Sequence, residues 1–352
     1  MINYTLLEKT PRLLLQANLW PSQGDRFQPT GFADLGAAVY TRPEPDGKTG
    51  VRMLLVESAQ SIANRLEKTC LDGDGPDLDP ELAGLPYVAA TLKNSGDQIE
   101  PIRTSSLVEA HRLASPYFLK TNFGDKLASE MAYTTKGPLN WKKIYAVLFK
   151  YDPNALVHGV FLSLLGDGRI RVPRAVSGFI EAENVNEAVS GGVKNSPVDP
   201  KGEIQVDGVD TEKGVYSNVP YARVEYVASK ITAFFNVDLA LIRGYALGDS
   251  AAQLLTALAL LKIKRFLSSQ LRLRTACDLC LKGAVTADLP EGFVLPEETE
   301  LLAEVKRLIA ACKPLFADPP VTELVTPVKV VRKKDKAEPD AEANAAATGA
   351  GE

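Results

Sequence analysis

The segment that most constrains the fold is an apolar run at residues 53–56 that leads directly into polar residues at 57–67. Ser58 is well placed to cap a helix, and Ile62 and Leu66, four residues apart, would share one of its faces. The pattern therefore predicts a strand followed at once by a capped amphipathic helix. The opposite face of that helix would carry Gln60, Ser61, Asn64 and Arg65.

A helix start of this kind suits a polyanion. Free backbone N–H groups and the positive end of the helix dipole, joined by amide and guanidinium side chains, can hold phosphate or ribose oxygens without reading a base. The same residues also fit an ordinary capped helix that packs one face on a core. The residues alone leave both interpretations open.

A polar loop precedes this unit. Residues 21–32 are rich in Gly and Pro, contain Arg26 and Phe27, and lie between the apolar runs at 13–15 and 37–40. The expected order is therefore a strand, a polar loop, a pair of strands and the capped helix.

Two sequence motifs resemble those of the RAMP superfamily of CRISPR-associated proteins. They are Gly-Asp-Arg-Phe-Gln-Pro-Thr-Gly-Phe at 24–32 and Glu-Ser-Ala-Gln-Ser-Ile-Ala-Asn-Arg-Leu-Glu at 57–67. The resemblance is strongest to the backbone subunit of the type I-G (formerly I-U) Cascade complex. Residues 109–115 and 271–275 also resemble segments of this family, so the resemblance spans roughly residues 10–330.

The resemblance implies an α+β fold: a ferredoxin-like antiparallel palm of the RNA-recognition-motif type, with inserted elements. Finger or web insertions are expected near residues 70–140 and a thumb near 190–220, all within one hand-like domain at 1–332. Residues 333–352 contain no apolar side chain larger than alanine, so this segment is expected to be a disordered tail.

The implied function is that of a non-catalytic CRISPR RNA-binding subunit in antiviral defence against foreign DNA. Copies would stack head to tail along the guide, and a thumb from each would kink it. The implied partners are the large subunit, a guide-end-capping and RNA-processing RAMP subunit, target DNA reached through the guide, and a recruited helicase-nuclease. Target sequence would be read by base pairing.

The expected RNA-binding residues come from three parts of the chain. The loop and the helix start are implied by the resemblance, and two basic runs are added because they are clusters of Lys and Arg. The residues are Gln23, Arg26 and Gln28 in the loop, Ser58, Gln60, Ser61, Asn64 and Arg65 in the helix, and Arg169, Arg171, Lys262 and Arg265 in the basic runs.

Overall charge does not favour a nucleic-acid binder. The chain has 352 residues, is 45% hydrophobic and 24% charged, and carries a net charge of −4. RNA binding therefore requires basic side chains to be concentrated on one face. Residues 250–276 contain five basic and no acidic side chains, and residues 169–174 form a second basic run. Each run is equally well explained as a solvated face.

Nothing in the sequence indicates export or a membrane partner. The N-terminus lacks a basic start followed by an apolar stretch, and no run of 18 apolar residues occurs, so a cytoplasmic location is expected. The four cysteines do not form a disulfide framework. Cys277 and Cys280 are expected on a helix, where buried thiols are favoured over zinc.

The rest of the chain predicts alternating strands and helices. Residues 156–163 and 169–172 indicate a hairpin that contains His158 as a satisfied interior histidine. A glycine-rich segment at 191–214 should protrude, either as a mobile loop or as the thumb. Strands are expected at 221–227 and 234–239, a largely helical stretch at 247–281, and a helix at 297–315.

Catalysis has little support. The chain has two histidines and no Walker A, Gly-x-Ser-x-Gly or His-Glu-x-x-His motif, and no metal or cofactor is expected. Two alternatives remain: a metal-dependent RAMP endoribonuclease that uses Asp25, and an RNA-binding module outside CRISPR systems.

Overall fold

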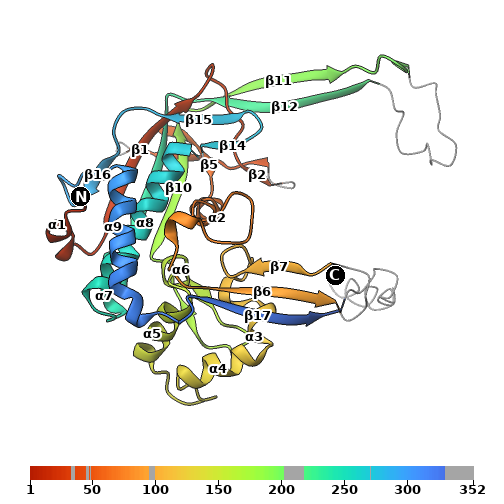
Figure 1. Cartoon of the computed structure of the whole chain (residues 1–352). Coiled ribbons are helices and arrows are strands. Elements are labelled where there is room, and N and C mark those ends of the chain that lie inside the picture. The colour runs from red at the N-terminus through yellow and green to blue at the C-terminus, as the bar shows by residue number, and fades with distance from the viewer. Residues whose placement is uncertain are drawn as a thin grey trace, which may run out of the picture.

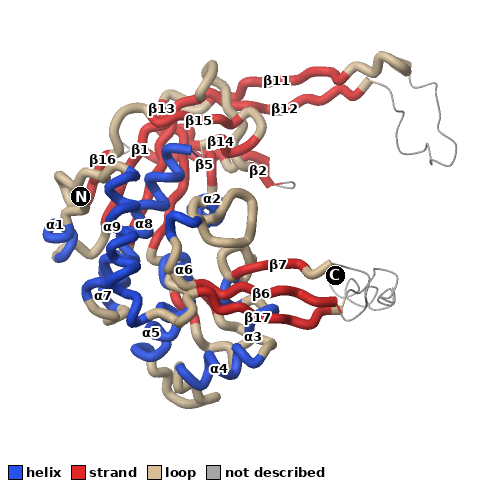
Figure 2. Tube along the Cα trace, viewed as in Figure 1, coloured by secondary structure: helices blue, strands red, loops and turns tan. Residues whose placement is uncertain are grey.

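The computed structural model describes residues 1–32, 36–44, 47, 49–94, 100–201, 218–269 and 271–329. The expected tail at 333–352 and the centre of the expected thumb lie outside these residues. Within them the fold is α+β, as predicted (Figures 1 and 2). None of the described helices is both long and apolar enough to cross a bilayer.

The main sheet is antiparallel and has the strand order β14-β15-β1-β13-β10-β5-β4, with β16 also paired to β1. Its strands are β1 (Leu13–Pro21), β4 (Val39–Pro43), β5 (Gly50–Glu57), β10 (Val176–Glu183), β13 (Lys230–Val237), β14 (Arg272–Arg274), β15 (Cys277–Leu281) and β16 (Thr286–Leu289). The hairpin expected around residues 43–50 is confirmed, since β4 pairs with β5 there.

Helices pack on one face of this sheet (Figure 1). They are α2 (Ala59–Lys68), α8 (Asp249–Ser269) and α9 (Glu298–Cys312), flanked by α1 (Tyr4–Glu8) and α7 (Leu239–Gly244). The approach of α2 is close at Gly178: a Cβ added there would lie 3.1 Å from Ile62 Cγ2 and 2.8 Å from the Phe234 carbonyl oxygen. A side chain at this position of β10 would therefore clash with the neighbouring strand β13 and crowd Ile62 of the helix.

A second sheet lies apart from the first. It contains β6 (Tyr87–Asn94), β7 (Ile102–Ser105) and β17 (Val321–Val328), and β17 pairs with β6 in parallel. Around it are α3 (Pro116–Leu119), α4 (Asn122–Glu130), α5 (Trp141–Tyr151) and α6 (Asn154–His158). The region expected as an insertion is thus built together with a strand from the far end of the chain.

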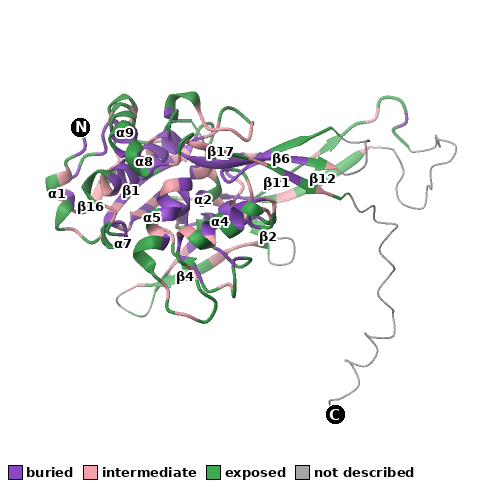
Figure 3. Ribbon diagram, turned by 60° about the horizontal axis from the view of Figure 1, so that its bottom comes forward, coloured by how far each residue is buried: buried purple, intermediate pink, exposed green. Residues whose placement is uncertain are grey.

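A two-stranded ribbon, β11 (Asn186–Lys194) and β12 (Val219–Val227), extends away from the main sheet (Figure 1). Most of its residues are exposed, whereas α8 and the central strands are mostly buried (Figure 3). Residues 186–194, partly expected as loop, are therefore strand, and the period-two pattern at 221–227 is confirmed. Short pairs β2 (Gly31–Phe32) with β3 (Gly36–Ala37), and β8 (Val160–Phe161) with β9 (Arg171–Val172), complete the strands described.

Two sequence predictions are wrong. Residues 272–281 form the β14–β15 hairpin and not helix, which puts Cys277 and Cys280 on a strand; three residues apart, they point to opposite faces, and Cys277 is buried while Cys280 is exposed. His158 is expected within a strand of the hairpin at 156–163 but ends helix α6. It is buried, as expected, but neither ring nitrogen has a hydrogen-bond partner among the described residues.

Candidate nucleic-acid interface

The polar loop at residues 22–30 is fixed in place by its backbone. Phe27 and Tyr226 exchange two N–H to carbonyl hydrogen bonds of 2.9 Å, and the Gln28 N–H donates to the Ala276 carbonyl at 2.8 Å. Phe27 is fully buried and anchors the loop. The loop therefore joins the base of the β12 strand to the turn between β14 and β15.

The start of α2 forms as the sequence predicts. The Ser58 side chain caps the helix by accepting from the Ser61 N–H at 3.3 Å. Ile62 and Leu66 are buried on the sheet side. On the outer side the Gln60 Nε2 donates to Asn64 Oδ1 at 3.1 Å, and both side chains are exposed.

A buried carboxylate connects the loop to the helix. Glu57, the last residue of β5, is fully buried and forms ion pairs with Arg65 (Nε to Oε1, 2.9 Å) and with Arg274. Arg274 Nη1 also donates to the carbonyl oxygens of Gln28 at 3.0 Å and Val56 at 3.2 Å. One cluster therefore holds the loop, the strand end and the helix start together.

The cluster carries an excess positive charge. Two guanidinium groups face one carboxylate, while burial raises the pKa of the adjacent Cys277 thiol to about 11 and keeps it neutral at pH 7. Burial also lowers the pKa of Arg65 and of Arg274 from the ordinary arginine value. The side chains of Arg65 and Arg274 remain 22% and 25% exposed, so the surplus charge can act on a neighbouring anion.

Of the other loop residues, Gln23 and Arg26 are exposed. The Arg26 side chain is 56% exposed and only reaches Glu225 at 3.8 Å. Gln28 is less accessible, and its side-chain oxygen is buried with no hydrogen-bond partner among the described residues. Arg26 is therefore the loop cation most available to an external ligand.

The two basic runs behave differently from this cluster. Arg169 donates to Asp167 at 2.8 Å and to the carbonyl oxygens of Gly137 and Thr134 at 3.0 Å, so its guanidinium fastens a loop. Arg171 is exposed and its guanidinium carbon lies 4.1 Å from the centre of the Phe161 ring.

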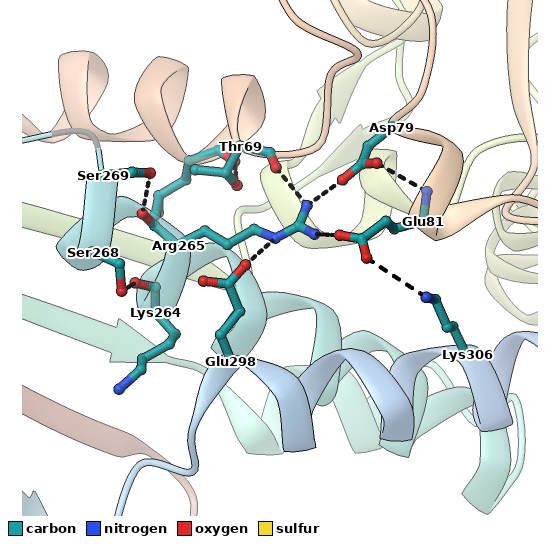
Figure 4. Close-up of polar contacts among 10 residues, drawn as sticks. Thr69, Asp79, Glu81, Lys264, Arg265, Ser268, Ser269, Glu298 and Lys306 are labelled. Carbon is teal, nitrogen blue, oxygen red and sulfur yellow. Dashed lines mark hydrogen bonds and ion pairs between the residues drawn. The ribbon is translucent and has the colours of Figure 1, made fainter.

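Lys262 and Arg265 are both buried on α8, which removes them from any surface that RNA could reach. Arg265 donates to Asp79 (2.7 Å), Glu81 (3.0 Å) and Glu298 (3.0 Å), and to the Thr69 carbonyl (3.0 Å) (Figure 4). This group ties α8 to α9 and to the segment after α2. Burial therefore argues against the RNA-binding role expected for both residues, and for Arg265 the internal pairing does so as well.

The sequence analysis did not select Arg174 or Arg112 as site residues. Arg174 Nη2 donates to Gln60 Oε1 at 2.7 Å, which places a third guanidinium beside the start of α2. Arg112 pairs with Glu67 on the next turn. Arg174 belongs to the basic run at 169–174, which could have identified it. Arg112 lies within the motif at 109–115, which could have identified it in the same way.

Comparison with known proteins gives one family. The family model described as CRISPR-associated protein GSU0053 matches residues 13–187, a stretch that contains the loop and α2. No curated protein matches the chain.

Similar solved structures include a CRISPR RNA-guided surveillance complex in a pre-nicking state (15% identity, 86% of this chain and 89% of that chain, TM-score 0.39). A second CRISPR RNA-guided surveillance complex has 15% identity, coverage of 86% and 88%, and a TM-score of 0.30. Csc2 from Thermofilum pendens has 10% identity, coverage of 90% and 80%, and a TM-score of 0.30. Because these TM-scores are low, we infer no function from the three likenesses.

Proposed function

We propose that this chain, whose residues 13–187 match the CRISPR-associated GSU0053 family, is a non-catalytic backbone subunit that binds CRISPR RNA in a type I-G Cascade complex. Copies would assemble along one guide, together with the other Cascade subunits. The observation that carries the proposal is the single cluster in which Glu57, Arg65 and Arg274 join the polar loop to the start of α2. The cluster ties together two segments that the sequence selects separately, which supports the proposal that they form one surface.

Chemistry at this surface suits an RNA backbone. It offers helix N–H groups, the exposed amides of Gln60 and Asn64, the exposed Arg26, and a cluster with one excess positive charge. These groups contact phosphate and ribose, which fixes the position of a strand and carries no sequence information.

The palm assignment is supported by chain order. β1, α2, β10, β13, α8 and β15 follow one another as strand, helix, strand, strand, helix, strand, with β4 and β5 added beside β10. This is the order of the ferredoxin-like fold to which the RNA-recognition motif belongs. The projecting β11–β12 ribbon would then be the stem of the thumb, and the β6–β7–β17 sheet would belong to the finger or web.

The proposal is tested by the salt dependence of RNA binding. Arg26→Ala should weaken binding to all RNA sequences about equally, and should make the slope of log K against log salt shallower by roughly 0.7 if one phosphate contact is lost. Arg26 is preferable to Arg65, because Arg65→Ala also removes a partner of buried Glu57 and would destabilise the fold. Arg307, 58% exposed on α9, is the matched control.

Affinity and slope that stay unchanged in Arg26→Ala would remove the loop from the RNA path. Equal effects of Arg26→Ala and Arg307→Ala would mean that only general charge matters.

One observation favours the ribonuclease alternative. Asp25 lines a pocket of about 690 Å³ together with Glu225 and Asp278, three carboxylates beside the proposed RNA path. Glu225 is paired with Arg223 at 2.9 Å, and Asp278 accepts from the Ser22 hydroxyl at 3.2 Å. Among the residues described, no group of three or more potential ligands is placed to hold a metal ion. The incubation of RNA with the protein and magnesium, described in the Discussion, separates the two functions.

A further inference from the structure

A groove of about 370 Å³ lies between α1, α7 and the first turns of α8, on the side of the molecule that carries the N-terminus (Figure 1). Its floor is apolar, because Leu7, Leu239 and Ile242 line it with side chains that are almost completely buried. The volume is at the lower end of the range of ligand sites. The groove can therefore receive a few small apolar side chains.

The groove also carries an excess of negative charge. Glu8 and Asp249 are exposed beside the floor, and among the described residues neither carboxylate has a hydrogen bond or an ion pair. The guanidinium of Arg243 lines the groove too, but it donates to the carbonyl oxygens of Leu7 at 3.2 Å and Thr10 at 2.9 Å. Arg243 therefore fastens α7 to the end of α1. The complement of this surface is a short apolar segment that carries positive charge.

One segment of the chain itself has this composition. Strand β17 ends at Val328, and the sequence continues as Lys329-Val330-Val331-Arg332. No valine, leucine, isoleucine, methionine or aromatic residue follows Val331. Two adjacent apolar side chains are thus flanked by two cations. Their order matches an apolar floor that lies beside two carboxylates.

The groove and this segment belong to opposite sides of one molecule. In the views of Figures 1 and 3, β17 points away from α1 and α7. Four extended residues reach at most about 14 Å. A compact chain of this length has a radius of gyration of about 20 Å. Residues 329–332 are therefore too short to return to the groove of their own chain, and the groove that they can enter belongs to a second copy.

We propose that residues 329–332 of one copy occupy the groove between α1, α7 and α8 of the next copy. The two valines would lie on the apolar floor, and the two cations beside Glu8 and Asp249. A groove on one side and its complement on the other form a heterologous contact, which repeats in one direction and builds an open row of copies. The contact is between proteins and requires no RNA, so it goes beyond the proposed function.

Cysteine cross-linking of the full-length protein, freed of RNA by nuclease, tests this contact. Cys280, the exposed native thiol, is first replaced by serine in every copy. A Val331→Cys copy mixed with a larger, tagged Ala252→Cys copy should then form a mixed disulfide under mild oxidation, because Ala252 lines the groove. The matched control is Ala303→Cys, since Ala303 is exposed on α9 outside the groove. It should give only the background of random collisions.

Charge reversal tests how the two sides recognise each other. Lys329→Glu together with Arg332→Glu should lower the yield of mixed disulfide, roughly 1.4- to 5-fold for each exposed ion pair that is lost. Glu8→Lys in the copy that supplies the groove should restore part of this yield, because opposite charges then face each other again. A yield that does not respond to either change would overturn the proposed occupant.

The cross-linking outcomes separate this contact from the proposed function. Equal yields at positions 252 and 303, or no mixed disulfide at 252, would overturn the contact and leave RNA binding standing. A chain that carries both cysteines and closes an internal disulfide on dilution would place the segment in its own groove, against the proposal. Failed assembly of the Cascade complex in Ala252→Trp, without a mixed disulfide at 252, would assign the groove to another subunit and also overturn it. A mixed disulfide in a protein that binds no RNA would establish the contact and overturn only the proposed function.

Discussion

Replacing Arg265 with methionine should destabilise the fold and leave RNA binding intact. The side chain is 9% exposed and serves three carboxylates (Figure 4). Removing one partner of a buried ion pair costs roughly 3–5 kcal/mol. Glu81 and Glu298 are 53% and 39% exposed and can return to water, whereas Asp79 is only 18% exposed. We therefore expect a loss near the lower limit, about 3 kcal/mol, because methionine keeps the packing of the arginine stem.

Thermal unfolding of the purified protein measures this loss. At roughly 2 °C per kcal/mol for a large domain, Tm should fall by about 6 °C. The Tm of Arg265→Lys should fall by less, because an ammonium group keeps the charge but cannot reproduce the fork geometry of the guanidinium. Arg307→Met is the control, since the exposed Arg307–Glu304 pair should contribute less than about 1 kcal/mol. A Tm unchanged in Arg265→Met, together with a shallower salt slope for RNA binding, would refute the structural role and restore Arg265 as an RNA contact.

Three further predictions concern pH, the C-terminus and catalysis. Burial depresses the pKa of His158 well below 6.5. The unfolded chain therefore binds a proton at His158 more readily than the folded chain, and the free energy of unfolding falls below pH 6.5 by up to about 1.4 kcal/mol per pH unit. Asp152 has the opposite effect on the free energy of unfolding, because burial raises its pKa to about 6. Urea unfolding at pH 7.5 and 5.5 should therefore show a smaller acid loss in His158→Leu than in the wild type, and equal losses would contradict this. Truncation after Arg332 should leave Tm and RNA affinity unchanged, because β17 ends at Val328; a marked fall in Tm would show that the tail docks. RNA incubated with the protein and magnesium should stay intact, and regular cleavage that disappears in Asp25→Ala would establish the ribonuclease alternative.

The sequence predicts local structure correctly where the pattern lies within one helix or one hairpin. The cap at Ser58 and the burial of Ile62 and Leu66 follow from spacing within one helix. The hairpin at residues 39–57 follows from two apolar runs around a Gly/Pro turn. The pattern at 247–281 predicts a largely helical stretch, and residues 271–279 fall within it. Their buried side chains nevertheless alternate at 271 and 273, then at 277 and 279, which is the period of a strand.

Contacts between residues far apart in the chain could not be predicted from local sequence patterns. The basic run at 250–276 gives no sign that Arg265 meets Asp79, 186 residues away in the chain. Likewise, the parallel pairing of β17 with β6 depends on how distant segments pack. Glu57 shows the same limit at the candidate site. Its position at the end of an apolar strand is visible in the sequence, but its pairing with Arg274 requires the β14–β15 hairpin, which the sequence pattern predicts as helix.

The measurement that bears most directly on the central proposal is the nucleic-acid content of the purified protein. Expressed together with a CRISPR array, the protein should elute as an assembly of several protomers that contains nuclease-sensitive RNA of one uniform guide length. Absorbance at 260 nm, denaturing gels and light scattering of the same fractions give content, length and protomer number. A monomer free of RNA under these conditions, or RNA of random length, would contradict a guide-binding backbone subunit.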